Sequence, residues 1–181
     1  ARIKPYLRVP LITVARINTP EIAEEILREG KADMVATGRA LIADPWWPNK
    51  AATGKRDEIR RCLSCNQGCM EQLAQEKTIT CLYNPEVGRE GELQPASRKK
   101  MVWVVGGGPA GMEAAIVSAT RGHRVELFER NARLGGQIGL AATPPGRQDF
   151  IAVKDFMTGE IKRLGIPVHL NGEMSVEKIR Q

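Results

Sequence analysis

The stretch "MVWVVGGGPAGMEAAIVSA", residues 101–119, joins an apolar run to a glycine-rich turn and then to apolar residues at helical spacing. Its glycines have the G-x-G-x-x-G spacing: Gly106, Gly108 and Gly111. A second apolar run, "RVELF" (124–128), ends at an acid, Glu129, which lies 18 residues after Gly111. A strand, a glycine turn, a helix, a strand and then an acid form the context of the dinucleotide-binding fingerprint.

Each residue type in this stretch has a physical reason. Gly106 permits the tight turn, Gly108 lets the backbone approach a pyrophosphate, and Gly111 lets the helix pack close to its strand. Free N–H groups at the helix start favour phosphate. Glu129 can accept hydrogen bonds from a ribose 2′-hydroxyl and would repel a 2′-phosphate. The alternative is a glycine-rich turn that binds no ligand.

The residues after the second strand bear on the choice between FAD and NAD. Pro109, Ala110 and the later "RLGGQ" (133–137) resemble the FAD domains of flavin disulfide reductases, so FAD is favoured. Further on, "IPVHL" (166–170) reads as a strand. Between them lies a helix whose apolar residues are better explained as core than as a site: Phe150, Val153, Met157, Ile161 and Leu164.

The N-terminal segment also predicts parallel β-structure. "VPLITVA" (9–15) and "DMVAT" (33–37) read as strands, and between them Thr19 is an N-cap, Pro20 a first helical residue and Gly30 a terminator. Another helix is expected to open at Gly38. Two strands cannot cover a parallel sheet, so this segment is expected to be the end of a larger unit.

All four cysteines of the chain lie within twenty positions, with the spacing C-x2-C-x3-C-x11-C: Cys62, Cys65, Cys69 and Cys81. A Gly-, Pro- and charge-rich linker, residues 86–100, follows them. Disulfides are improbable in the expected cytoplasmic setting. Zinc and free thiols remain alternatives, but three bunched cysteines with a distant fourth favour an iron–sulfur cluster.

Composition sets wider limits. The chain has 181 residues, 42% of them hydrophobic, which suits one domain or two small ones. Without a signal-like or membrane-spanning segment, a cytoplasmic protein is expected. The net charge of +6 is scattered among acids and only 4% of residues are aromatic, so nucleic-acid binding is disfavoured.

The order of "CLSCNQGC", "VVGGGPAG", "ELFER" and "LGGQ" resembles the iron–sulfur flavoenzyme branch of the old yellow enzyme family. That branch includes 2,4-dienoyl-CoA reductase, trimethylamine dehydrogenase and enoate reductases. The resemblance implies an α/β chain in three parts. Residues 1–55 would be the end (strands 7 and 8) of an FMN-binding TIM (β/α)8 barrel, 56–92 the 4Fe-4S segment and linker, and 93–181 the first part of a Rossmann-like FAD-binding domain.

The same resemblance implies cofactor ligands. The FMN phosphate would be held by Arg16 and by the backbone of Gly38 and Arg39, although Ala15 stands where the family usually has glycine before that arginine. The four cysteines would ligate the 4Fe-4S cluster. The FAD ligands would be Gly106, Gly108, Ala110, Gly111, Glu129, Gln137, Arg147 and Met174.

The function implied is a reductase that passes electrons from NAD(P)H through FAD and the cluster to FMN, and then reduces an activated C=C bond such as that of a dienoyl-CoA. An amine dehydrogenase, an electron-transfer or flavin-binding module without catalysis, and a zinc-stabilised structural subunit are the alternatives. The partners expected are an enoyl or dienoyl thioester and the remainder of a longer polypeptide or assembly. Without the neighbouring strands that the longer polypeptide would supply, these residues alone are expected to be inactive and prone to aggregate.

Overall fold

The computed structural model describes residues 3–180 and has a mixed α/β fold. The chain divides into two compact units, Ala1–Gly88 and Arg89–Gln181. Each unit contains a parallel sheet, as the sequence predicts. The finer division into three parts stays a prediction.

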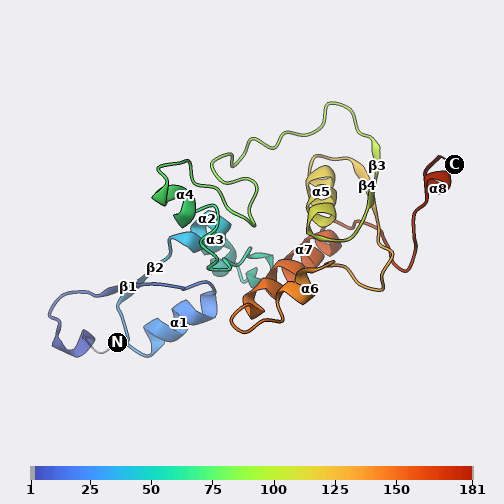
Figure 1. The fold of residues 1–181 in the computed structure, drawn as a ribbon. Coiled ribbons are helices and arrows are strands. Elements are labelled where there is room, and N and C mark those ends of the chain that lie inside the picture. The colour runs from blue at the N-terminus through green and yellow to red at the C-terminus, as the bar shows by residue number, and fades with distance from the viewer. Residues whose placement is uncertain (1–2, 181) are drawn as a thin grey trace. The chain divides into compact units, whose positions relative to one another are not determined.

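The N-terminal unit is built on a β–α–β arrangement (Figure 1). Strands β1 (Ile12–Val14) and β2 (Met34–Ala36) pair in parallel, and α1 (Pro20–Arg28) connects them. The predicted start of α1 is confirmed: the Thr19 hydroxyl accepts a hydrogen bond from the Ile22 N–H, and Pro20 is the first helical residue. Gly30 follows the helix with a φ of +63°, a conformation that favours glycine. Both strands are shorter than the apolar runs suggest.

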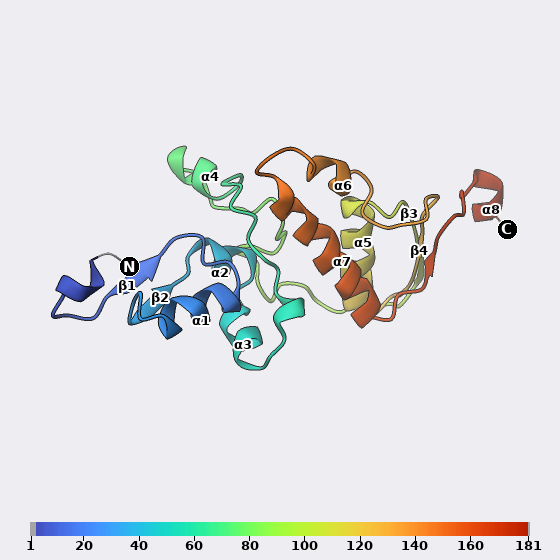
Figure 2. The ribbon, with the colours of Figure 1, turned by 90° about the horizontal axis from the view of Figure 1, so that it is seen from below.

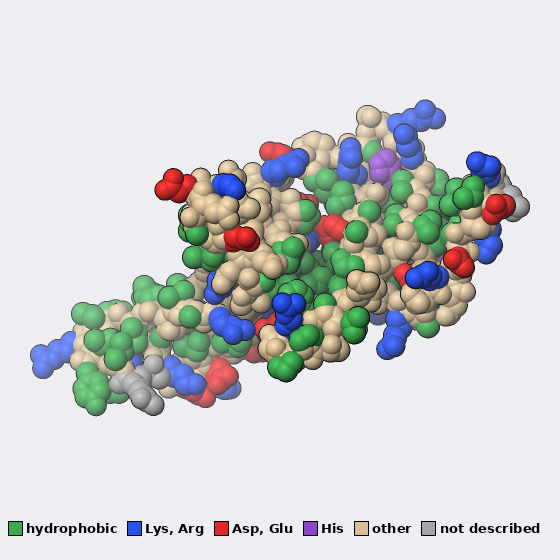
Figure 3. All heavy atoms as spheres, in the orientation of Figure 1, with side chains coloured by type: hydrophobic (Ala, Val, Ile, Leu, Met, Phe, Trp, Pro, Cys, Tyr) green, Lys and Arg blue, Asp and Glu red, His purple; other side chains and the backbone are tan. Residues whose placement is uncertain are grey.

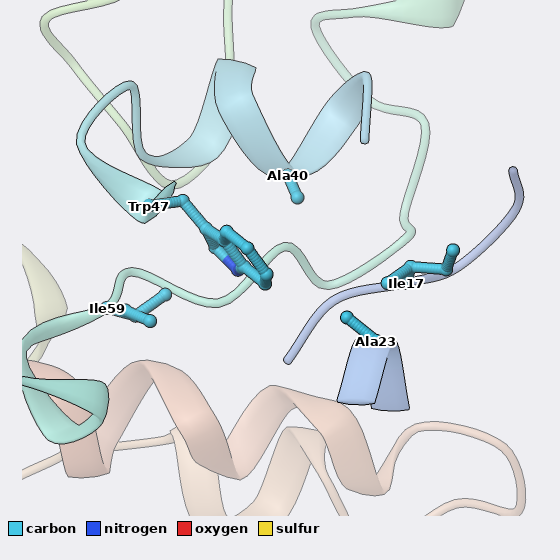
Figure 4. Packing of buried hydrophobic residues seen from close by; sticks show 5 residues of the cluster. All are labelled: Ile17, Ala23, Ala40, Trp47 and Ile59. Atoms are coloured by element: carbon cyan, nitrogen blue, oxygen red, sulfur yellow. The ribbon is translucent and has the colours of Figure 1, made fainter. Parts of the chain in front are cut away.

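Short helices complete this unit. The 3-10 helices are Lys4–Tyr6 and Arg56–Glu58, and the α-helices are α2 (Arg39–Ala43), α3 (Trp47–Ala52) and α4 (Met70–Ala74). The opening of α2 at Gly38 agrees with the sequence. A small core joins the β–α–β arrangement to the chain that leads into the cysteines, with the Trp47 ring among aliphatic side chains (Figure 4). The buried residues of this core are Ile17, Ala23, Ala40, Trp47 and Ile59.

The C-terminal unit has a three-stranded parallel sheet in the order β3-β4-β5. Its strands are β3 (Met101–Val105), β4 (Arg124–Phe128) and β5 (Val168–His169). Helices α5 (Pro109–Thr120) and α7 (Ile151–Arg163) lie side by side, and α5 packs on the sheet (Figure 2). The remaining elements are α6 (Ile138–Ala141), the 3-10 helix Gln148–Phe150 and α8 (Val176–Arg180).

Burial in this unit follows the predicted pattern. Met112 of α5 and Leu127 of β4 are fully buried, and Val153, Met157 and Ile161, three of the five apolar residues predicted as core, are buried in α7. On β3 the residues alternate, and Met101, Trp103 and Val105 are exposed. Helix α5 therefore covers one face of the sheet, and α7 packs on α5.

The surface is mixed in charge. On the face drawn in Figure 3, Lys and Arg side chains are dispersed among acidic and apolar ones. Among the described residues, no helix is both long and apolar enough to cross a membrane.

Candidate functional site

The turn between β3 and α5 depends on the absence of side chains. Gly106 has a φ of +108°, which L-residues rarely adopt. A Cβ at Gly111 would lie 1.8 Å from the Gly106 carbonyl oxygen, so the first turn of α5 touches the backbone of the turn. A Cβ at Gly108 would meet no atom within 4 Å. The first turn of α5 is therefore closely packed at Gly111 and open at Gly108.

Glu129, at the end of β4, is held as a buried acceptor with 6% of its surface exposed. Its Oε2 accepts a 2.7 Å bond from the Gly107 N–H, and its Oε1 accepts 2.8 and 2.6 Å bonds from the backbone and side-chain nitrogens of Asn131. The Asn131 backbone N–H is the largest cause that lowers the Glu129 pKa below its ordinary value, and burial opposes it. The carboxylate thus stays ionised beside the glycine turn.

A cavity of about 550 Å³ opens at the carboxyl ends of these strands. It brings together predicted residues that are far apart in sequence: Gly106, Glu129, Gln137 and Met174. Ligands of open α/β sheets bind at this edge, outside the carboxyl ends of the strands.

Other predicted FAD residues are placed differently. Gly108 lies beside the cavity-lining Gly136, whose added Cβ would be 3.0 Å from the Gly108 Cα. Ala110 is exposed in the first turn of α5. Arg147 is exposed and lies over the Phe150 ring, 5.9 Å from its centroid, and it is not among the residues that line the cavity.

Sequence reasoning missed several residues that line this cavity or lie next to it. Asn131 fixes Glu129, and the Gly107 N–H does the same from the glycine turn. A Cβ at Gly107 would lie 2.5 Å from Leu134, so this middle glycine, outside the fingerprint spacing, is also required sterically. The other cavity residues that sequence reasoning missed are Arg130, Gly172 and Glu173, whereas Gly136 belongs to the predicted "RLGGQ" stretch.

In the N-terminal unit the four cysteines line one small pocket, the cysteine pocket, together with Arg39 and Asn66. Within the described chain every cysteine is a free thiol. Backbone N–H groups of Ser64 and Tyr83 each donate a 3.4 Å bond to a sulfur, that of Cys62 and that of Cys81. Burial, as the largest cause, raises the pKa of the Cys62 thiol, while the Ser64 N–H and the Arg39 charge oppose it.

The donor set fits a group that takes thiolate ligands, because four cysteines line one pocket and two of their sulfurs receive N–H bonds of the kind that stabilise sulfur anions. In residues 3–180 no group of three or more His, Cys, Asp or Glu side chains is gathered as for a single metal ion.

Buried polar side chains hold the cysteine pocket against the β–α–β arrangement. Asn18 is 6% exposed, and its Nδ2 donates 3.0 Å bonds to the Cys62 carbonyl and the Ser64 hydroxyl. The Trp47 indole N–H donates a 3.3 Å bond to the Asn18 carbonyl. Asn18, which follows β1, therefore joins this part of the chain to the first cysteine, Cys62, by hydrogen bonds.

The three predicted FMN residues follow the two strands of this sheet. Because Val14 pairs with Ala36, Arg16 and Gly38 come after the same edge of the sheet. Ala15 has a φ of 127° and Arg16 a φ of 48°, so the departure from glycine at Ala15 falls where the backbone favours glycine. Arg39 opens α2, and its guanidinium donates a hydrogen bond to the Asn66 side chain.

Comparisons with known proteins agree with both units. Residues 1–58 match the NADH:flavin oxidoreductase / NADH oxidase family, and residues 102–164 match the FAD dependent oxidoreductase family. The chain is 47% identical over 181 residues to an NADH oxidase of Thermoanaerobacter brockii. This match covers 98% of the chain and 28% of that protein. It is 44% identical to a cinnamate reductase of Clostridium sporogenes, over 99% of this chain and 27% of that protein.

A solved structure of 2-naphthoyl-CoA reductase, in complex with 2-naphthoyl-CoA, superposes with a TM-score of 0.92 at 35% identity. The match covers 98% of this chain and 27% of that protein. The chain thus spans little more than a quarter of the length of the relatives it matches. Both of its units match flavoprotein oxidoreductase families, and this confirms the predicted resemblance to the iron–sulfur flavoenzyme branch of the old yellow enzyme family.

Proposed function

We propose that these residues form the central part of a multi-cofactor flavin oxidoreductase, in which electrons pass from NAD(P)H through FAD and a 4Fe-4S cluster to FMN and reduce an activated C=C bond. One observation carries the proposal: a chain with a nucleotide-type cavity in one unit has four free thiols lining one pocket in the other. When bound, the flavins and the cluster would supply hydride and single-electron chemistry that side chains lack.

The C-terminal unit is proposed to be the first part of a Rossmann-like FAD-binding domain. The turn at Gly106 and the open side of Gly108 would admit the pyrophosphate, and the N–H groups of Ala110 and Gly111 would donate to it. Glu129 would accept from an adenosine ribose hydroxyl, because three N–H donors of Gly107 and Asn131 already orient its carboxylate. The further FAD contacts proposed are Gln137, Met174 and Arg147. Arg147 has the least support, because it is not among the residues that line the cavity.

The N-terminal unit is proposed to supply strands 7 and 8 of a TIM barrel through residues 1–55, with 56–92 as the cluster segment. β1 and β2 are parallel neighbours with a helix between them, as successive barrel strands are. Arg16, Gly38 and Arg39 would hold the FMN phosphate after these strands. Cys62, Cys65, Cys69 and Cys81 would ligate the cluster.

The substrate class proposed is an enoyl or dienoyl thioester, reduced as by a 2,4-dienoyl-CoA reductase. The likeness to a cinnamate reductase and to 2-naphthoyl-CoA reductase supports the reduction of a conjugated C=C bond. Oxidation of an amine is the competing activity that the experiment below includes.

The test is an anaerobic assay of the intact holoprotein. NADH or NADPH oxidation is followed with a 2,4-dienoyl-CoA and with cinnamate, and amine oxidation is followed in parallel with a one-electron dye. Dependence of nucleotide oxidation on the unsaturated substrate, lost in Cys69→Ser and kept in the exposed control Thr78→Ser, is the expected result. Turnover with amines alone would contradict the proposed direction of electron flow.

A further inference from the structure

Arg39 has a contact that phosphate binding does not explain. Its Nη1 donates to Oδ1 of Asn66, which lies between Cys65 and Cys69 in sequence. Arg39 also lines the cysteine pocket with all four thiols. Among the described residues that line this pocket, Arg39 is the one whose side chain carries a formal charge at neutral pH.

The base of this side chain is fixed. Arg39 is the first residue of α2, whose Ala40 and Ala43 are buried. The side chain of Asn84, itself 5% exposed, donates a 3.0 Å bond to the Ile42 carbonyl of the same helix. The guanidinium is therefore held at one end by a packed helix and at the other by Asn66.

The geometry points to Arg39 as a redox-positioning residue, a fixed cation that favours the reduced form of the cluster in the cysteine pocket. This inference rests on the proposed function, in which the cluster takes one electron from a reduced flavin and passes it on. Each electron adds one negative charge to the pocket, and a nearby cation stabilises that charge more strongly in a partly buried site than in water. Net charge and hydrogen bonding near the sulfurs are what set such reduction potentials.

Asn66 is the partner that keeps the cation in place. It has a φ of +63°, which asparagine and glycine tolerate. Asn66→Gly therefore removes the acceptor of the Arg39 bond while the backbone of the turn keeps its conformation. This substitution frees the guanidinium without changing the charge of the protein.

The experiment is a redox titration of the intact holoprotein in which the electron paramagnetic resonance signal of the reduced cluster is followed. Arg39→Gln is expected to lower the midpoint potential so that the reduced fraction relative to the oxidised one falls about tenfold, or about 59 mV for one electron. The midpoint potential of Arg39→Lys should fall by less than half of the drop expected for Arg39→Gln. The midpoint potential of Asn66→Gly should lie between those of Arg39→Lys and Arg39→Gln. Lys31→Gln, the matched loss of a positive charge on a residue that pairs with Glu29 and does not line the pocket, should leave the midpoint unchanged.

FMN content separates this role from phosphate binding. Wild-type protein stripped of FMN is titrated alongside, because Arg39→Gln is also expected to lose FMN. A midpoint in Arg39→Gln equal to that of the FMN-free wild type would overturn the inference while the proposed function stands. Wild-type protein without sulfide or a cluster signal would overturn both. If Arg39→Gln does not fold, a midpoint of Asn66→Gly equal to that of the wild type overturns the inference.

Discussion

The Glu129 carboxylate accepts a 2.7 Å hydrogen bond from the backbone N–H of Gly107, which joins the end of β4 to the glycine turn after β3. The same carboxylate also binds both nitrogens of Asn131. Glu129 therefore shapes the turn as well as facing the cavity, and changing it tests structure and binding together.

Glu129→Ala should lower the free energy of unfolding by about 1–3 kcal/mol, because buried N–H donors lose their acceptor. FAD retention should weaken by about the same amount, since the ribose would lose a charged partner. Chemical unfolding and flavin content after gel filtration measure the two effects. Full FAD retention in a correctly folded variant would remove Glu129 from the proposed site.

The pH dependence follows from the sign of the Glu129 shift. Its pKa in the folded protein lies below the ordinary value of 4.5, so its stabilising contribution is complete above that value and is lost as the pH falls through the lower folded-state pKa. The stability difference between wild type and the uncharged Glu129→Gln should be constant near neutral pH and shrink below about pH 4.5. A difference that grows on acidification would contradict this assignment.

Gly111→Ala should destabilise the protein by about 1–3 kcal/mol or more, because overpacking forces the backbone to move. The added Cβ would lie 1.8 Å from the Gly106 carbonyl oxygen. Gly159→Ala in α7 is the matched control: its Cβ meets nothing within 4 Å, so stability should rise by about 0.5–1 kcal/mol. Thermal unfolding of both variants checks the contrast, and equal effects would refute the close approach.

Ala15→Gly should raise stability by about 1 kcal/mol, since non-glycine residues in this backbone region are strained. The φ of 127° at Ala15 is the basis. Ala36→Gly in β2 is the control, and it should lower stability by about 0.5–1 kcal/mol through chain entropy. A loss of stability in Ala15→Gly would mean that the position is not strained.

The elements were predictable where local chemistry decides them. Thr19 and Pro20 mark the start of α1, and the glycine spacing marks the turn before α5. The spacing of the four cysteines predicted that they lie together in one pocket. The hydrogen bonds that hold this pocket could not be predicted, because they join residues far apart in sequence: Arg39 and Asn66 are 27 residues apart, and Asn18 and Cys62 are 44 apart.

The residues around Glu129 show the same limit. An asparagine two positions after an acid is an ordinary surface sequence, and only the folded chain turns both of its nitrogens onto the carboxylate. The strands were overestimated in length because an apolar run does not show which of its residues pair, and only three residues of each run form a strand.

Metal and sulfide analysis of the intact protein, purified without oxygen, tests the central claim that the cysteine pocket holds an iron–sulfur cluster. Four thiolate ligands per cubane predict about four iron and about four sulfide per chain. Cys69→Ser should lose most of both while FMN stays bound. Stoichiometric zinc without sulfide would contradict the account.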